Sequence, residues 1–476
     1  MKNKNYKKGG EVIASGGFGC VFNPALICKG SKKREESKIS KLMTIKHAEQ
    51  EYKEINEIKK KLDNVKDYEN YFLLDNITKC EIKSLTPSDL KNFDKKCKAL
   101  PKNEINKKNI NKKLDKIMAI NIPNGGIPVD DYIYNNKSFA KIYELHSSLV
   151  NLLEKGIIPM NQKNIYHCDI KDSNVLVSEK NDIMKTRLID WGLTTEYIPF
   201  KNSPFPKTWR NRPLQFNVPF SVIIFTDAFI EKYTDFIEEN GKEIIKQEIH
   251  LKPFVINYLN FWMKERGKGH YQFINEVMYT LFHNSLTGLT TEAKVKLIET
   301  QTTMDYIVNY IVNVLMHFTK FREDGSLNLR NYLDNVFIKI VDIWGFIFVY
   351  YPLVELLGNN YLVLTENELK LFNKLQYIFV NYLFEPRNEE IKMDMLYSDL
   401  KDLGKIINEN VYKIKINNKT DNEKYTFSKS SKISKRERTQ KTKKTLKKSS
   451  KQKSSISFKR ISKKNIFEKP FLLHLK

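Results

Sequence analysis

The stretch YHCDIKDSNVLV, residues 166–177, constrains the fold more than any other part of the chain. It places Asp169, Lys171 and Asn174 in one loop, directly before β-branched residues that are typical of a buried strand. A turn into a strand needs Gly, Asn or Asp for backbone reasons, but not a carboxylate, a lysine and an asparagine at these offsets. Phosphoryl transfer needs a base, a neutralising cation and a metal ligand. We therefore expect catalytic side chains in this loop.

The size and cysteine content of the chain bound its class. Its 476 residues can hold two lobes with appendages, and 41% hydrophobic residues can form a sizeable core. The N-terminal MKNKNYKKGG is charged, with no apolar segment behind it, so the chain is not expected to be secreted. The cysteines are odd in number and form no CxxC pair: Cys20, Cys28, Cys80, Cys97 and Cys168. This pattern predicts reduced thiols in an intracellular compartment, rather than disulfides or a zinc framework.

The positive charge is concentrated at the C-terminal end. Residues 421–476 hold 19 Lys and Arg against 4 Asp and Glu, with ten serines and no glycine, whereas the whole chain carries +25. Such a segment cannot bury an apolar face, so residues 417–476 are predicted to form a disordered basic tail. The tail could bind nucleic acid or another polyanion without reading sequence, or serve as an import signal.

One apolar stretch resembles a membrane segment in composition only. VFIKIVDIWGFIFVYYPLVELL, from Val336, contains two acidic residues, a lysine and a proline. Its longest uncharged run, residues 343–354, is shorter than the ~20 residues that a spanning helix needs. We expect a buried core helix here and no transmembrane segment.

A glycine-rich stretch near the N-terminus could approach phosphate groups. GGEVIASGGFGCVFNPA predicts a strand, a turn at Gly16, Gly17 and Gly19, and a second strand that resumes at Val21. Glycines let backbone N–H groups come close to phosphate oxygens. Ala14 stands where the first glycine of a GxGxxG would be. A glycine-rich turn is also common in ordinary hairpins, so this stretch needs support from elsewhere in the chain.

A strand lysine and a helix glutamate could provide that support. SKISKLM predicts a strand with Lys41 in its middle, and residues 46–62 carry apolar residues at helical spacing. We choose Glu51 as the partner of Lys41, with Glu54 in reserve, because Ile55 and Ile58 continue the same helix face. The alternative is a solvated lysine and solvated glutamates, as expected in so lysine-rich a chain.

The segment after the opening loop offers a second metal ligand. NVLVSEKNDIMKTRLIDWG predicts a hairpin whose second strand leads into Asp190, followed by an aromatic residue and a glycine. The hairpin brings its two ends together, so Asn174 and Asp190 can converge on one cation.

In this order the motifs resemble those of the protein kinase superfamily. HCDIKDSN resembles HRDxKxxN, IDWG resembles DFG, and SKISKLM resembles the VAIK strand. With GGFGCVF and RPLQFNVPFS, the chain is most similar to divergent serine/threonine protein kinases of large nucleocytoplasmic DNA viruses. The resemblance covers about residues 10–415 and is firm at 10–60 and 118–220. It implies an intracellular setting: host cytoplasm, nucleus or virion.

The resemblance implies roles for the matched residues, with ATP and Mg²⁺ as cofactors and a protein substrate. Asp169 would be the catalytic base and Lys171 would neutralise the transferred phosphoryl group. Lys41, paired with Glu51, would hold the α- and β-phosphates, and Asn174 and Asp190 would bind Mg²⁺. The remaining nucleotide-binding positions would be Ala14, Gly16, Gly17, Gly19 and Val21 in the glycine-rich hairpin, and Ala119, Ile120, Asn121 and Ile122 along the adenine slot.

The chain also departs from the family pattern. Cys168 replaces the arginine that usually binds a phosphorylated activation loop, so that form of switching is not expected. No APE triplet is present, and about 120 residues separate WRNRPLQFNVPFS from Asp342, which resembles the aspartate that opens a buried central helix of the larger lobe. We read the excess as a helical insertion.

The expected fold is α+β and two-lobed, with a small β-rich N-lobe and a large helical C-lobe. The N-lobe would span residues 1–122, with a Lys-rich insertion at about 79–116. The C-lobe would span 123–416, with a helical insertion at about 225–335, and the tail 417–476. Two alternatives to an active serine/threonine kinase stay open: a pseudokinase that acts as a binding scaffold, and a small-molecule phosphotransferase of the aminoglycoside or choline kinase type. Lys171 argues against the small-molecule phosphotransferase. The presence of Lys41, Asp169 and Asp190 argues against the pseudokinase.

Overall fold

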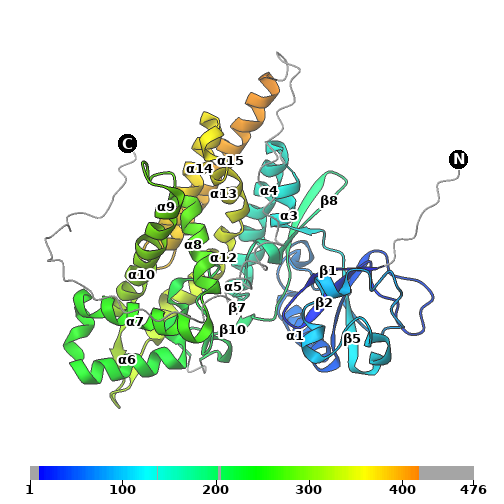
Figure 1. Cartoon of the computed structure of the whole chain (residues 1–476), viewed down its shortest axis with the longest axis horizontal. Coiled ribbons are helices and arrows are strands. Elements are labelled where there is room, and N and C mark those ends of the chain that lie inside the picture. Colours follow the sequence, from blue (N-terminus) through cyan, green and yellow to red (C-terminus); the bar gives the residue numbers. More distant parts are fainter. Residues whose placement is uncertain (1–9, 137, 202–204, 418–476) are drawn as a thin grey trace, which may run out of the picture. The chain divides into compact units, whose positions relative to one another are not determined.

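The chain has a mixed α+β fold in which helices predominate (Figure 1). Its structure is a computed structural model that describes residues 10–136, 138–201 and 205–417. The α+β class agrees with the prediction from sequence. The predicted basic tail, apart from Asn417, lies outside the described residues.

The N-terminal part is built on a five-stranded antiparallel sheet with the strand order β1-β2-β3-β5-β4 (Figure 1). The glycine-rich turn joins β1 to β2, as predicted, and helix α1 follows β3 directly. The elements are β1 (Glu11–Ser15), β2 (Gly19–Asn23), β3 (Lys38–Thr44), α1 (Ile45–Leu62), β4 (Thr78–Cys80), α2 (Phe93–Lys96) and β5 (Ile117–Pro123).

The two faces of this sheet are covered by different segments. On one face Met43 and Ile120 pack with Ala48 of α1. On the other face Leu42 and Ala119 belong to a buried cluster that includes many residues of 82–110. Alternating side chains of β3 and β5 therefore serve two small cores. The Lys-rich insertion predicted at about residues 79–116 is a folded cover, since its apolar residues are buried against the sheet.

Two disulfides cross-link this part of the chain: one ties the cover to β2, and the other ties the segment after β2 to β4. Cys20 pairs with Cys97 and Cys28 pairs with Cys80, at sequence separations of 77 and 52 residues. The prediction of five reduced thiols was wrong for these four cysteines. The pairs are brought together by the folding of the insertion over the sheet, which spacing along the chain does not reveal. Cys168 is free and buried.

Short sheets and the first helices of the larger part follow. The predicted hairpin is β8 and β9, and β6 extends it to three strands, while β7 pairs with β10. The loop that holds Asp169 runs from β7 to β8. These elements are β6 (Ile127–Pro128), α3 (Val129–Asn135), α4 (Phe139–Leu152), α5 (Ile158–Gln162), β7 (Ile165–Tyr166), β8 (Val175–Lys180), β9 (Ile183–Leu188) and β10 (Thr195–Glu196).

The remainder is helical apart from one small two-stranded sheet, and the region predicted as a helical insertion holds α6 to α10. Its elements are α6 (Asp227–Asn240), α7 (Glu248–Arg266), α8 (Gly269–Phe282), α9 (Thr291–Leu297), α10 (Thr303–Phe318), β11 (Lys320–Phe321), β12 (Leu327–Asn328), α11 (Arg330–Tyr332), α12 (Ile338–Phe348), α13 (Tyr351–Gly358), α14 (Glu366–Phe379) and α15 (Met393–Asn417).

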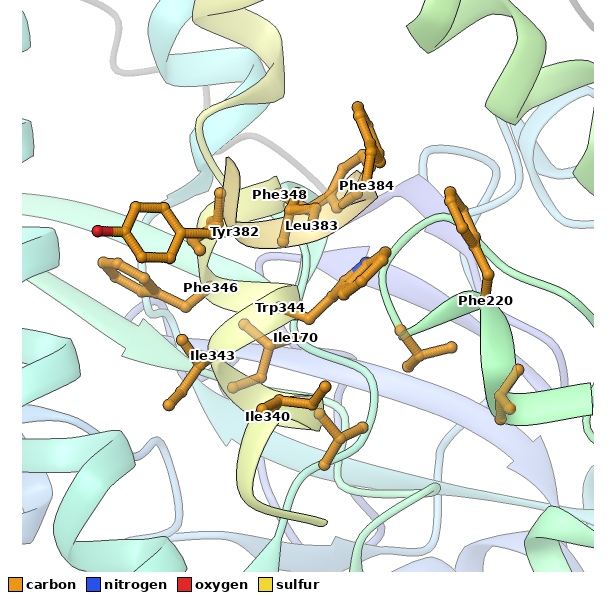
Figure 2. Close-up of a cluster of buried hydrophobic side chains, with 14 of the residues drawn as sticks. Ile170, Phe220, Ile340, Ile343, Trp344, Phe346, Phe348, Tyr382, Leu383 and Phe384 are labelled. Carbon is orange, nitrogen blue, oxygen red and sulfur yellow. The ribbon is translucent and has the colours of Figure 1, made fainter. Parts of the chain in front are cut away.

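Helix α12 is the predicted core helix. Ten of its eleven residues are buried, and Trp344 packs edge-on against Phe220, which stacks on Phe384 (Figure 2). Ile170, next to Asp169, lies beside Ile340, Ile343 and Trp344 (Figure 2). The core therefore reaches the loop that carries the candidate base.

Within the described part of the chain, no single helix has the length and apolar character to cross a membrane. The segments 330–348 and 351–358 reach that threshold only when taken together, with a bend of 41° between them.

Candidate active site

The loop between β7 and β8 buries the carboxylate of Asp169 and satisfies both of its oxygens. Lys171 Nζ lies 2.8 Å from Oδ2, and Asn174 Nδ2 donates to the same oxygen at 2.9 Å and to the Asp169 carbonyl at 2.8 Å. The structure thus brings together the side chains of Asp169, Lys171 and Asn174, as expected from their spacing in the loop. Asp169 is only 7% exposed, so its orientation is fixed by these contacts.

Asn217 is a fourth member of this group, and sequence reasoning missed it. Its side-chain amide donates to Asp169 Oδ1 at 2.9 Å and to the Ile170 carbonyl at 3.2 Å. Trp344 Nε1 donates to the carbonyl of Phe216, which holds the residue before Asn217 against α12. The only signal in the sequence is that Asn217 is a polar residue between two apolar ones, Phe216 and Val218.

The charges around Asp169 keep it ionised. Burial acts to raise its pKa, but the Lys171 ammonium and the hydrogen bonds from Lys171 and Asn217 outweigh burial, so the pKa lies below its usual value. Asp169 is therefore a carboxylate that can accept a proton at neutral pH, which a general base must do.

Asp342 anchors the loop from behind. Its carboxylate accepts the backbone N–H of His167 at 2.8 Å and that of Cys168 at 2.7 Å. Three residues further along α12, a Cβ at Gly345 would lie 2.6 Å from the Ile170 carbonyl oxygen. The loop thus rests directly on the backbone of α12, and only glycine fits at that contact.

His167 connects the loop to the segment of Asp190. Its Nε2 lies 3.1 Å from the Ile189 carbonyl, and the Asp169 N–H points at its Nδ1 at 3.3 Å. These contacts assign the proton to Nε2. Burial lowers the pKa of His167, which favours this neutral form. The ring also packs on Trp191, which meets Phe72 edge-on.

Two non-glycine residues of the site have left-handed backbones. Cys168 has φ 58° and Asp190 has φ 66°, a region that most L-residues avoid. Such conformations cost ~1–3 kcal/mol and concentrate at functional sites. One strained residue, Cys168, directly precedes the candidate base Asp169, and the other is Asp190, the candidate metal ligand.

Lys41 lies between Glu51 and Asp190. Its Nζ is 2.7 Å from Glu51 Oε1 and 3.8 Å from Asp190 Oδ1. Burial acts to lower the pKa of Lys41, but the two carboxylates outweigh burial and raise it. The other helix glutamates have different neighbours: Glu49 pairs with Lys79, and the reserve candidate Glu54 accepts from Gln50.

The glycine-rich turn is shaped by packing on one side and by open space on the other. A Cβ at Gly19 would lie 2.4 Å from Met43 Cγ, whereas Gly17 has nothing within 4 Å of its Cβ position. Gly16 N–H donates to the Gly19 carbonyl at 2.9 Å, which closes the turn. Ala14 and Val21 face each other across the β1–β2 pair. Gly19 is thus required by the sheet, and Gly16 and Gly17 are free to approach a ligand.

The predicted adenine-slot residues divide between the two faces of β5. Ile120 and Ile122 lie opposite Lys41 and Ile39 in the β3–β5 register and share the face of Lys41. Ala119 and Asn121 point to the other face, where Asn121 is buried and bonds Ser40 Oγ. Their backbones are also paired on both edges, by β3 and β4. The structure therefore brings only Ile120 and Ile122 to the Lys41 face.

The chain leaves β5 through two glycines that lie against β8. A Cβ at Gly126 would lie 1.9 Å from the Val177 carbonyl oxygen, and φ is 103°. A Cβ at Gly125 would lie 2.6 Å from a methyl group of Leu176. Residues 124–126 thus run close to the strand that follows the Asp169 loop.

Asn174 and Asp190 suit a cation that arrives with phosphates. Ile189 N–H donates to the Asn174 carbonyl at 3.0 Å, which places the two ligand residues side by side in the fold. The Asn174 side-chain nitrogen is engaged by Asp169, so its oxygen is the atom left for a metal, and the Asp190 side chain is 51% exposed. Among the described residues, no group of three or more His, Cys, Asp or Glu side chains could hold a metal ion. Mg²⁺ commonly takes one or two protein ligands together with phosphate oxygens and water.

Comparisons with known proteins do not assign the chain to a family. No protein-family model matches it, and no curated protein matches it significantly. The function is therefore proposed from the geometry of the site.

Proposed function

We propose that the chain is a serine/threonine protein kinase that transfers the γ-phosphoryl group of Mg²⁺-bound ATP to a protein hydroxyl. The observation that carries the proposal is the ionised, buried carboxylate of Asp169, held by Lys171, Asn174 and Asn217 and backed by Asp342. A carboxylate with a lysine at 2.8 Å is suited to accept a hydroxyl proton beside a developing phosphate charge.

The nucleotide would bind on the side of Lys41. In this proposal Lys41, oriented by Glu51, contacts the α- and β-phosphates, and the backbone N–H of Gly17 contacts a phosphate oxygen. Asn174 and Asp190 would hold Mg²⁺, which neutralises phosphate charge. The two-lobed kinase fold is part of the same proposal: residues 10–122 would form the small lobe and residues 123–416 the large one.

An assay with radiolabelled ATP tests this function. The full chain, Mg²⁺ and generic protein substrates should give labelled phosphoserine or phosphothreonine, and Asp169→Asn should abolish the label. Absence of transfer by the wild-type chain, with intact ATP binding, would contradict the proposal and favour the scaffold alternative. Transfer to an aminoglycoside or choline, but to no protein, would favour the small-molecule alternative.

A further inference from the structure

A buried arginine lies directly behind the candidate catalytic loop. Arg212 is 4% exposed, and its guanidinium donates to the Cys168 carbonyl and, at 3.0 Å, to Gln215 Oε1. Within the described residues no carboxylate lies at ion-pair distance from it, and Asp169 and Asp342 act on it only at longer range. Burial lowers the pKa of Arg212. A buried cation without a close anion is costly, so an anionic ligand would stabilise it.

Arg212 lines a cavity that could admit such a ligand. The cavity has a volume of about 340 Å³, and its charged lining consists of Arg212, Arg266 and Glu265. Aromatic side chains of α7 form its apolar wall: Tyr258, Phe261 and Trp262. Arg266 Nη2 lies 3.3 Å from Asn211 Oδ1, which joins the end of α7 to the segment that carries Arg212.

Exposed basic residues lie beside this cavity. We call Arg210, Arg266 and Lys268 the basic rim; all three are exposed. Arg266 lines the cavity, Arg210 directly precedes the lining residue Asn211, and Lys268 lies two residues beyond Arg266. Two acids lie among them, Glu265 and Asp227, the latter 4.0 Å from Arg210. The region borders the Asp169 loop through Arg212, whose guanidinium donates to the carbonyl of Cys168, directly before Asp169.

Helix stability explains only part of the rim. Arg266 stands in the last turn of α7, where a cation complements the helix dipole, so its charge needs no ligand. Lys268 is the opposite case. It occupies the N-cap of α8, makes no side-chain cap bond there, and is followed by a first turn without acidic residues. A cation at a helix N-terminus is unfavourable, so local structure does not account for Lys268.

We infer that the enzyme selects acceptor hydroxyls flanked by anionic residues, whose carboxylate or phosphate oxygens bind Arg212 in the cavity and the basic rim at its mouth. This inference rests on the proposed kinase function and adds the substrate class. Cations beside the acceptor would attract acidic segments and disfavour basic ones.

Peptide substrates of one length and with one central serine test the inference. The flanking residues are Glu in the first peptide, phosphoserine in the second, Gln in the third and Lys in the fourth. We expect the Glu or the phosphoserine peptide to exceed the Gln peptide about tenfold in kcat/KM, and the Lys peptide to be poorest. A higher rate with phosphoserine than with Glu would identify phosphate as the preferred source of oxygens. Equal rates for all four peptides would overturn the inference and leave the kinase proposal standing. Absence of transfer to every peptide and protein would overturn both.

A charge-reversal variant locates the effect. Arg266→Glu with Lys268→Glu should remove most of the preference for the Glu peptide by raising its KM, with the KM for ATP unchanged. The matched control is Lys296→Glu with Lys401→Glu, which makes the same change of net charge at exposed positions on α9 and α15. The control should keep the preference. An equal loss of rate on all four peptides in the first variant, or loss of preference in the control, would contradict a role of the rim in selection.

Discussion

Asn217 donates its side-chain amide to Asp169 Oδ1 at 2.9 Å across 48 residues of sequence. This bond ties the segment after β10 to the candidate base. It also completes the shell around a carboxylate whose other oxygen already binds Lys171 and Asn174. The position of the proposed base thus depends on three parts of the chain: the loop itself, the Asn217 segment and α12.

Removal of the Asn217 amide should move the pH dependence of the reaction. The bond lowers the pKa of Asp169, so Asn217→Ala should raise it and shift the acid limb of the pH–rate profile to higher pH. We also expect a stability loss of about 1–3 kcal/mol, because buried acceptors lose a donor. The control is Asn410→Ala, which removes a buried amide that donates to the Ile406 carbonyl. It should cost stability without moving the profile. An unmoved acid limb in Asn217→Ala would contradict this account of Asp169.

The Lys41–Glu51 pair should behave as one unit. Lys41→Ala and Glu51→Gln should each lower phosphoryl transfer, by about 10²-fold for the lysine, and the double variant should be little worse than Lys41→Ala alone. The Lys79–Glu49 pair, which joins β4 to the same helix, provides the control: both partners are exposed, and its removal should change neither rate nor stability by more than ~1 kcal/mol. Fully additive losses for Lys41 and Glu51 would show that the pair does not act through a shared contact.

Titration of Asp342 should make both the stability and the activity of the protein depend on pH. Burial raises the pKa of Asp342 to about 6, while the two backbone N–H groups and Arg212 act in the opposite direction. An acid with a folded pKa above its unfolded value binds more protons when folded. Its contribution to the free energy of unfolding therefore falls as pH rises from about 4 to about 6, by roughly 3 kcal/mol in total. Activity should change in the other direction, because only the carboxylate can accept both N–H groups of the loop.

Urea unfolding and rate measurements between pH 4 and pH 8 check this. The difference in unfolding free energy between wild type and Asp342→Asn should depend on pH between 4 and 6 and be constant above pH 7. A difference that is constant over the whole range would show that Asp342 does not titrate as described.

Both disulfides should contribute to stability, but only one of them should affect nucleotide binding. Loss of either pair, as Cys20→Ser with Cys97→Ser or as Cys28→Ser with Cys80→Ser, should cost about 2–4 kcal/mol. Only the loss of the Cys20–Cys97 pair should also raise the KM for ATP. Its partner Cys97 precedes Lys98 and Ala99, whose N–H groups donate to Ser15 Oγ at the glycine-rich turn. Equal KM values for both double variants would contradict this link, and four free thiols in the purified native protein would contradict the pairing itself.

Local patterns predicted much of the framework. Strand β3, helix α1, the β8–β9 hairpin and the buried helix α12 were each expected from alternation, helical spacing or an uncharged apolar run. The contact of Lys41 with Glu51 followed from the same spacing, because residues on one helix face point the same way. The cluster of Asp169, Lys171 and Asn174 lies within six residues, so one loop suffices to bring it together.

Contacts between distant segments were not predictable in this way. Asn217 reaches Asp169 only because its segment packs on α12 through Phe216 and Trp344. The cysteine pairs depend on how the insertion folds over the sheet. The pleat of β5 places the side chains of Ile120 and Ile122 on the face of Lys41 and those of Ala119 and Asn121 on the opposite face.

The most direct test of the central claim compares transfer and binding in Asp169→Asn. The change keeps the size of the side chain but removes the charge that accepts the hydroxyl proton. The account predicts a fall in phosphoryl transfer of about 10²- to 10⁴-fold, with the affinity for MgATP, measured by calorimetry, unchanged within about twofold. Wild-type transfer by Asp169→Asn would contradict the assignment of Asp169 as the base.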